Sequence, residues 1–184
     1  MTQYDVIVAG GGLAGLSAAI FLARAQVTVA IFDQGESSLL RVSRLNNYLG
    51  FPDGVSGSEL IELGRRQAQR FGARLHVERL TAVSRRANSF AVSSSAGEYE
   101  CTYLILASNK RTDLARALGL ALGGFGGRFL SVAGDGATAV PNCYAAGRIT
   151  GLPSQAIVSA GDGAKVAVAI IERLRGGYYV DHDV

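Results

Sequence analysis

The sequence has 184 residues, of which 48% are hydrophobic and 18% are charged, with 24 glycines and a formal net charge of +3. This balance excludes a disordered chain, and the length leaves room for one ordinary domain but not for two complete nucleotide-binding domains. The basic residues are scattered and lack the stripe of a nucleic-acid-binding module, so no nucleic-acid partner is expected. No apolar run approaches a membrane span and the N-terminus lacks a signal peptide, so we expect no membrane partner and a cytoplasmic location.

The first part of the chain predicts a strand–helix–strand unit. The expected elements are a buried strand, a helix of small and apolar residues and a second buried strand, over residues 4–9, 13–24 and 27–32. Short runs rich in Val and Ile are typical of parallel strands, and a unit of this kind has a right-handed crossover. A long polar loop follows, after which the capping-box spacing of Ser56 and Glu59 predicts a helix over residues 59–71.

The second half predicts an antiparallel β-meander and then a return to the central sheet. Three strands joined by short turns are expected over residues 74–83, 89–93 and 98–107. The last of these becomes wholly apolar, which indicates that it joins the central sheet. Beyond it we expect a short helix, a flexible glycine patch, two short strands and a long final helix, over residues 112–122, 123–127, 128–132, 143–146 and 154–175.

The two cysteines, Cys101 and Cys143, both lie in apolar segments. They have neither the CxxC spacing of a redox pair nor the spacing of metal ligands, so we expect two core thiols and no metal site. Unpaired core cysteines are typical of a reducing compartment.

A glycine motif follows the first predicted strand, because Gly10, Gly12 and Gly15 have the spacing GxGxxG. Such glycines permit a tight turn, close approach of the backbone to a pyrophosphate, and close packing of helix on strand, while the helix N-terminus attracts the anion. Asp33 ends the second strand, where a carboxylate accepts hydrogen bonds from adenosine ribose hydroxyls and repels the 2′-phosphate of NADP. The motif predicts a dinucleotide site, with NAD and FAD both open at this point.

Further segments carry a resemblance to a known family. Residues 47–52 read NYLGFP, residues 54–60 read GVSGSEL, and two apolar strands end at Ala107 and just before Gly147. Together with the glycine motif and in the same order, they resemble the FAD domain of thioredoxin reductase and its relatives among the two-dinucleotide-binding flavoproteins. The resemblance covers nearly the whole chain. It implies an α/β fold, with a single FAD-binding Rossmann-type domain over residues 1–184, a parallel central sheet with helices, and a small antiparallel meander.

The resemblance also implies FAD as the cofactor and a homodimer as the assembly. The cofactor-binding residues that it implies are Gly10, Gly12, Leu13, Ala14, Gly15, Asp33, Gln34, Asn47, Arg79, Leu80, Ala107, Ser108, Gly147, Arg148, Gln155 and Ala156. The glycine loop would receive the pyrophosphate, and Asp33 the adenosine ribose. Asn47, Gln155 and Ala156 would lie beside the flavin, where the dipole of the final helix favours the negative charge of the reduced ring.

Three departures from the family pattern bear on function. Asn109 stands where the family has the glycine of Ala-Thr-Gly, and Arg148 stands where it has the aspartate that holds the ribityl and phosphate region. An arginine cannot accept a hydrogen bond but can pair with a phosphate; a surface role without a ligand is equally open. Only a short bridge over residues 109–140 occupies the place of a complete NADPH domain with its redox-active CxxC.

The expected function is that of an FAD-dependent oxidoreductase that is not an autonomous thioredoxin reductase. Electrons would come from an external donor, either a free nicotinamide cofactor or a separate partner protein, and pass to an acceptor that the sequence does not name. The alternative is a non-catalytic FAD-binding sensor or electron-carrier subunit, and a third reading is an NAD-binding or cofactor-free remnant. No catalytic triad, carboxylate pair or metal constellation is present in the sequence, so no catalytic residue is assigned.

Overall fold

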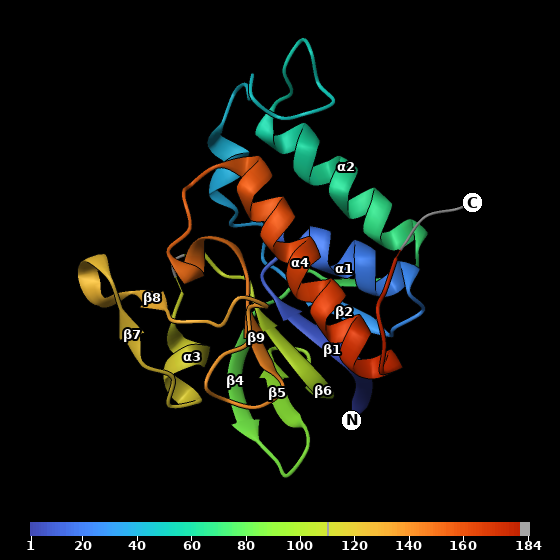
Figure 1. Ribbon diagram of the computed structural model, residues 1–184, viewed down its shortest axis with the longest axis vertical. Coiled ribbons are helices and arrows are strands. Elements are labelled where there is room, and N and C mark those ends of the chain that lie inside the picture. Colours follow the sequence, from blue (N-terminus) through green and yellow to red (C-terminus); the bar gives the residue numbers. More distant parts are fainter. Residues whose placement is uncertain (110, 181–184) are drawn as a thin grey trace.

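The computed structural model describes residues 1–109 and 111–180, which form a mostly parallel sheet with layers on both faces (Figure 1). Its parallel strands are, in spatial order, β3 (Arg74–His76), β2 (Val29–Phe32), β1 (Thr2–Ala9), β6 (Glu98–Leu106) and β9 (Cys143–Ala145). The first half of β6 also pairs with an antiparallel meander of β5 (Phe90–Ser94) and β4 (Leu80–Arg85). The predicted fold class, a parallel sheet with helices and a small antiparallel meander, is confirmed.

Three long helices pack together over one face of the sheet (Figure 1). They are α1 (Leu13–Arg24), α2 (Gly57–Arg70) and α4 (Ala156–Arg175). The predicted cap of α2 is present, since Ser56 Oγ accepts a hydrogen bond from the Glu59 N–H at 3.1 Å. Gly176 ends α4 in the left-handed conformation that favours glycine. None of the described helices combines the length and hydropathy that crossing a membrane requires.

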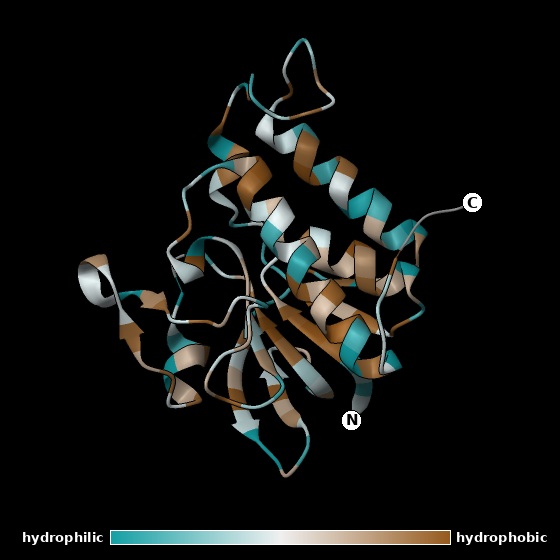
Figure 2. Cartoon of the chain, viewed as in Figure 1, coloured by the Kyte–Doolittle hydropathy of each residue, from teal (hydrophilic) through white to brown (hydrophobic). Residues whose placement is uncertain are grey.

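The central strands are apolar because both of their faces are covered. Successive residues of β1 alternate between two clusters: Val6 and Val8 pack under α1 and α4, whereas Ile7 and Ala9 face the opposite layer. That layer is formed by the meander, the short helix α3 (Asp113–Ala117) and neighbouring loops. Figure 2 shows β1 as hydrophobic and much of the outer surface of α2 as hydrophilic. Burial on both faces accounts for the unbroken apolar runs from which these strands were predicted.

The prediction of one strand over residues 74–83 is wrong, because the segment divides into β3 and β4. The His76 ring stacks on Phe32 with ring centroids 4.4 Å apart, which fixes β3 beside β2 in the central sheet. The next residue, Val77, is 88% exposed, and the chain then leaves the sheet before it begins the meander at Leu80. The aromatic contact therefore holds β3 in the central sheet, whereas the residue pattern predicts that it continues into β4 as one strand.

The segment between β6 and β9 differs from the prediction in two places. The helix expected over residues 112–122 is reduced to α3, and the expected glycine patch is the turn of a β-hairpin. The hairpin consists of β7 (Leu122–Gly123), a 3₁₀ turn (Phe125–Gly127) and β8 (Phe129–Leu130), and it projects from the body of the molecule (Figure 1). Gly124, Gly126 and Gly127 have positive φ, which explains why this turn is built from glycine.

Candidate cofactor site

The three glycines of the GxGxxG motif have different structural roles. A Cβ on Gly10 would lie 2.8 Å from the Ala107 carbonyl oxygen, and one on Gly15 would lie 1.9 Å from the Gly10 carbonyl oxygen. These two positions are closed to any side chain by neighbouring backbone. A Cβ on Gly12, in contrast, would meet only Ser37 Oγ at 3.8 Å, so this glycine faces open space. This is the arrangement that close approach of a pyrophosphate to the backbone requires.

The N-terminus of α1 adjoins this open space. Gly12 is the N-cap residue and provides no side chain to the first N–H groups, and the first turn contains no acidic residue. Leu13 packs against the core on the helical side of the sheet, and Ala14 and Gly15 are buried at the base of the helix. The free N–H groups and the positive end of the helix dipole therefore favour binding of an anion beside Gly12.

A cavity of about 360 Å³ lies at the carboxyl ends of β1, β2 and β6. Half of the predicted cofactor residues line it, namely Gly10, Gly12, Asp33, Gln34, Arg79, Leu80, Ala107 and Ser108. This edge of an open parallel sheet is the place where ligands bind in doubly wound folds. The adenosine and pyrophosphate residues that the resemblance implies are thus brought together around one hollow.

Two side chains of the cavity have distinctive partners. Asp33 Oδ2 accepts hydrogen bonds from Arg65 Nη2 and from the Gly35 N–H, both at 3.1 Å. Arg79 Nη2 pairs with Asp113 Oδ2 at 2.5 Å, while its buried Nε has no hydrogen-bond partner among the described residues. A buried donor without a partner is costly, so a ligand that accepts a hydrogen bond there would satisfy Arg79.

The residues expected beside the flavin form a second group outside this cavity. Asn47 Nδ2 donates a hydrogen bond to Gln155 Oε1 at 3.1 Å, although the two residues are 108 positions apart. Gln155 is the N-cap of α4, and Ala156 is its first residue; no side chain caps this helix. The structure therefore brings Asn47 to the uncapped N-terminus of α4, as the resemblance implies.

Gly147 and Arg148 follow β9 in the short helix η3 (Gly147–Thr150). The Gly147 N–H donates to the buried Asp162 carboxylate at 2.7 Å, and a Cβ on Gly147 would lie 2.7 Å from that of Ala14. Arg148 Nη1 donates to the carbonyl oxygens of Leu152 and Gly151 at 2.7 and 3.3 Å. Its guanidinium also lies 4.8 Å from the centre of the Phe129 ring. Arg148 is therefore held by the loop before α4 and by the β7–β8 hairpin.

Several residues that line the cavity were not predicted. They come from the loops after β2 and β6 and from α3, and are Glu36, Ser37, Ser38, Arg41, Asn109, Arg111, Asp113 and Leu114. Two contacts join these loops: Arg111 Nη2 to Glu36 Oε2 at 2.5 Å, and Asn109 Nδ2 to Ser38 Oγ at 3.0 Å. Their position directly after two buried strands is a signal that could have identified them.

Cys101 and Cys143 are both buried, as predicted, and burial raises the pKa of each thiol from 9.0 to about 12. A shift of this size lowers the thiolate fraction near neutral pH about a thousandfold. We therefore expect Ellman's reagent to titrate no thiol in the native chain and both thiols after denaturation in guanidinium. Rapid reaction of either thiol without denaturant would contradict their burial. The described residues contain no cluster of His, Cys, Asp and Glu that could hold a metal ion.

Comparison with known proteins places these features in a family context. Residues 5–43, which include the glycine motif and Asp33, match the family described as FAD binding domain. The chain is 41% identical over 110 residues to a bifunctional thioredoxin reductase/thioredoxin of Mycobacterium leprae, covering 58% of this chain and 24% of the relative. It is 36% identical over 110 residues to a thioredoxin reductase of Treponema pallidum, covering 58% of this chain and 36% of the relative. The chain thus matches about a quarter to a third of the length of these curated relatives.

Solved structures agree in fold. A thioredoxin reductase from Gloeobacter violaceus superposes with a TM-score of 0.90 at 18% identity, over 100% of this chain and 99% of that one. A ferredoxin-flavin thioredoxin reductase from Clostridium acetobutylicum superposes with a TM-score of 0.77 at 18% identity, over 96% of this chain and 99% of that one. The predicted resemblance is confirmed, and the comparisons indicate FAD. The residues fit it: Gly12 faces open space beside an uncapped helix, and Arg79 has a buried donor to satisfy.

Proposed function

Because the chain resembles the FAD-binding part of thioredoxin reductases, we propose that it is an FAD-dependent oxidoreductase with an external electron donor and a separate acceptor. The donor is a free nicotinamide cofactor or a partner protein. The observation that carries this proposal is the cavity at the ends of β1, β2 and β6, where the glycine loop, the uncapped α1 and Asp33 converge. We propose further that residues 1–184 form one FAD-binding domain in a cytoplasmic protein, with residues 109–140 as a short bridge.

Within this proposal each group of residues has one task. The backbone of Gly10 and Gly12 and the N-terminus of α1 bind the pyrophosphate, and Asp33 binds the adenosine ribose. Arg79 and Leu80 lie against the adenine, next to Ala107 and Ser108. Asn47, Gln155 and Ala156 orient the flavin at the N-terminus of α4, whose dipole favours negative charge. FAD supplies hydride and electron chemistry when bound, and the chain supplies binding, orientation and electrostatics.

A separate acceptor is proposed because the described residues offer no cysteine pair that could take electrons from the flavin, and an external donor because only a short bridge lies between β6 and β9. The two cysteines are buried in the sheet, and their raised pKa makes them poor nucleophiles. The bridge between β6 and β9 consists of α3 and the β7–β8 hairpin. Arg148 stands at the position of the family aspartate and is bound to two backbone carbonyls, so we propose that it contributes to the shape of the η3 loop and not to a phosphate contact.

The test is a cofactor spectrum followed by anaerobic reduction. Purified protein is expected to be yellow and to release FAD on denaturation, and a colourless protein that binds no added FAD would refute the proposal. The yellow protein is then mixed with NADH, with NADPH and with reduced ferredoxin, which is included because one structural neighbour is a ferredoxin-flavin thioredoxin reductase. Rapid bleaching by any of them supports an oxidoreductase. Absence of bleaching by all three favours the alternative, an FAD-binding sensor or electron-carrier subunit.

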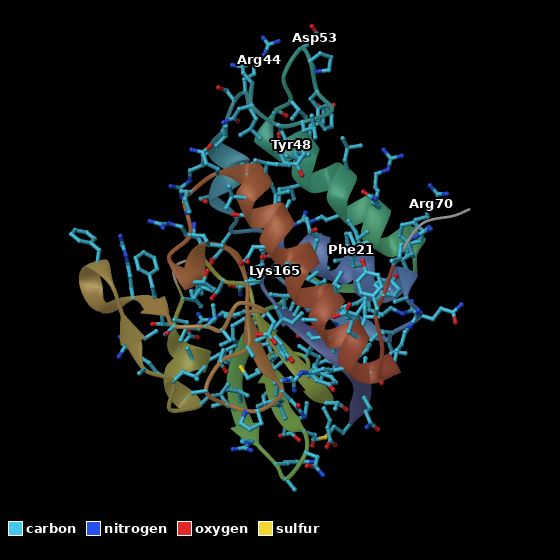
Figure 3. All side chains as sticks on the ribbon, in the orientation of Figure 1. Phe21, Arg44, Tyr48, Asp53, Arg70 and Lys165 are labelled. Carbon is cyan, nitrogen blue, oxygen red and sulfur yellow. The ribbon has the colours of Figure 1, made fainter. Side chains whose placement is uncertain are left out.

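A homodimer is also proposed, and a groove of about 710 Å³ supports it. The groove lies between α1 and α2, and Figure 3 labels Phe21, Tyr48 and Arg70 along it. Its wall is mainly apolar and includes Leu13, Leu16, Ile20, Phe21, Tyr48, Phe51, Leu60, Leu63 and Phe71. Exposed apolar grooves on a surface mark sites of protein contact or of ligand binding.

Light scattering coupled to gel filtration tests this assembly. We expect the wild type to elute as a dimer and Leu63→Asp to elute as a monomer, because a carboxylate in the groove would be desolvated in the contact. Leu63 is 37% exposed, so the substitution is tolerated in the monomer. Leu174→Asp, at a 44% exposed position near the end of α4 and outside the groove, is the matched control and should stay dimeric. Identical elution of the two variants would exclude this groove as the contact.

A further inference from the structure

The carboxylate of Asp33 is held in one orientation by three neighbours. Arg65 of α2 reaches across to Oδ2 at 3.1 Å, and the Gly35 N–H donates to the same oxygen at 3.1 Å. The glycine loop is also in close contact with this side chain, since a Cβ on Gly11 would lie 2.7 Å from Asp33 Cβ and 3.0 Å from Oδ2. The Asp33 side chain is only 17% exposed, so these neighbours determine its orientation.

The two oxygens of this carboxylate are therefore unequal. Oδ2 receives two hydrogen bonds, whereas Oδ1 receives none from any residue that the structure describes. An ionised carboxylate has room for about four donors, so Oδ1 keeps its full accepting capacity. Because Asp33 lines the cavity, Oδ1 is the oxygen that remains for a ligand there.

We propose that Arg65 is a positioning residue for the adenosine ribose: it fixes Oδ2 of Asp33 so that Oδ1 is presented to the ribose hydroxyls. This inference rests on the proposed function, because it requires FAD in the cavity. Arg65 does not itself line the cavity, so it would act on a ligand through Asp33. Its own side chain is 32% exposed. It also links the ribose end of the site to α2.

A purely structural role is the competing explanation. An ion pair exposed to this degree contributes little to folding, and its loss would then alter stability slightly without altering the discrimination between ligands. A positioning role makes a different prediction. Without Arg65 the carboxylate gains freedom, and only a ligand that carries ribose hydroxyls is affected.

Titration of the apoprotein with FAD and with its 2′,3′-dideoxyadenosine analogue separates these cases, with flavin fluorescence as the readout. Arg65→Ala is expected to weaken binding of FAD about tenfold, the size of a hydrogen bond to a charged group, and to leave binding of the analogue unchanged. Arg65→Lys, which retains one donor and the charge, should bind FAD within about threefold of the wild type. Arg85→Ala removes the same charge from the exposed edge strand β4 and should bind both ligands as the wild type does.

The outcomes distinguish failure of the positioning role of Arg65 from failure of FAD binding itself. The positioning role is overturned if Arg65→Ala weakens binding of FAD and of the analogue equally, or weakens neither. In that case FAD binding by the wild type still upholds the cofactor assignment. A wild type that binds neither ligand refutes the proposed function itself, and the role of Arg65 with it. A loss confined to FAD, with rescue by Arg65→Lys, establishes the inference.

Discussion

Replacing Gly163 by alanine is expected to lower the free energy of unfolding by about 3 kcal/mol, at the upper end of the usual cost of overpacking. A Cβ at this position in α4 would lie 2.0 Å from the carbonyl oxygen of Ala14 in α1. The position of the Cβ is fixed by the α4 backbone and the atom it meets belongs to the α1 backbone, so no side-chain rotation can relieve the clash. Because Ala14 belongs to the first turn of α1, separation of the helices would also disturb the anion site and weaken FAD binding.

The matched control lies two residues away in the same helix. Gly161 has no atom within 4 Å of the place of a Cβ, so Gly161→Ala gains helix propensity without a clash and should stabilise the chain by about 0.5–1 kcal/mol. Urea unfolding followed by circular dichroism measures both changes, and a shift of midpoint at constant slope identifies a change in stability. Opposite signs for the two variants are expected. A neutral Gly163→Ala would mean that α1 and α4 do not approach each other this closely.

The second large effect is expected on cofactor retention, where Asp33→Ala should raise the dissociation constant of FAD about a hundredfold. The substitution removes a charged hydrogen-bond acceptor from the cavity and leaves the Arg65 guanidinium without its carboxylate. Hydrogen bonds to charged groups contribute about 1.5–3 kcal/mol, which corresponds to roughly ten- to more than a hundredfold in affinity.

Asp53→Ala is the control for this loss of charge. Asp53 lies at the tip of the loop before α2, where Figure 3 labels it, and its carboxylate has no partner among the residues described. Fluorescence titration of each apoprotein with FAD should separate the two variants clearly. Retention of FAD by Asp33→Ala at wild-type affinity would show that the ribose assignment is mistaken.

The strand–helix–strand unit and the glycine loop could be predicted from the sequence because their signals are local. Uninterrupted apolar runs mark β1 and β2, and the spacing of Gly10, Gly12 and Gly15 marks the turn between strand and helix. The same holds for α2 and α4, whose ends are marked by Ser56 and Gly176. Each of these features is decided by residues within a few positions of one another.

Other features depend on pairs that are distant in the sequence. The division of residues 74–83 follows from the stacking of His76 on Phe32, 44 positions earlier, and the rim of the cavity joins Glu36 to Arg111, 75 positions later. The role of Arg65 could not be predicted from the sequence for the same reason. On a polar helix it reads as one more solvated arginine, and only the packing of α2 beside the end of β2 brings it to Asp33.

The burial of Cys101 and Cys143 has a practical consequence. A chain whose own thiols are hidden behaves toward maleimide and methanethiosulfonate reagents as if it lacked cysteine, so one introduced thiol becomes a unique attachment point. Phe125→Cys, at an 84% exposed position on the β7–β8 hairpin, would carry a spin label away from the body of the molecule. Paired with a label at Asp53→Cys, it would convert the separation between hairpin and loop into a distance measurable in solution before and after FAD is added.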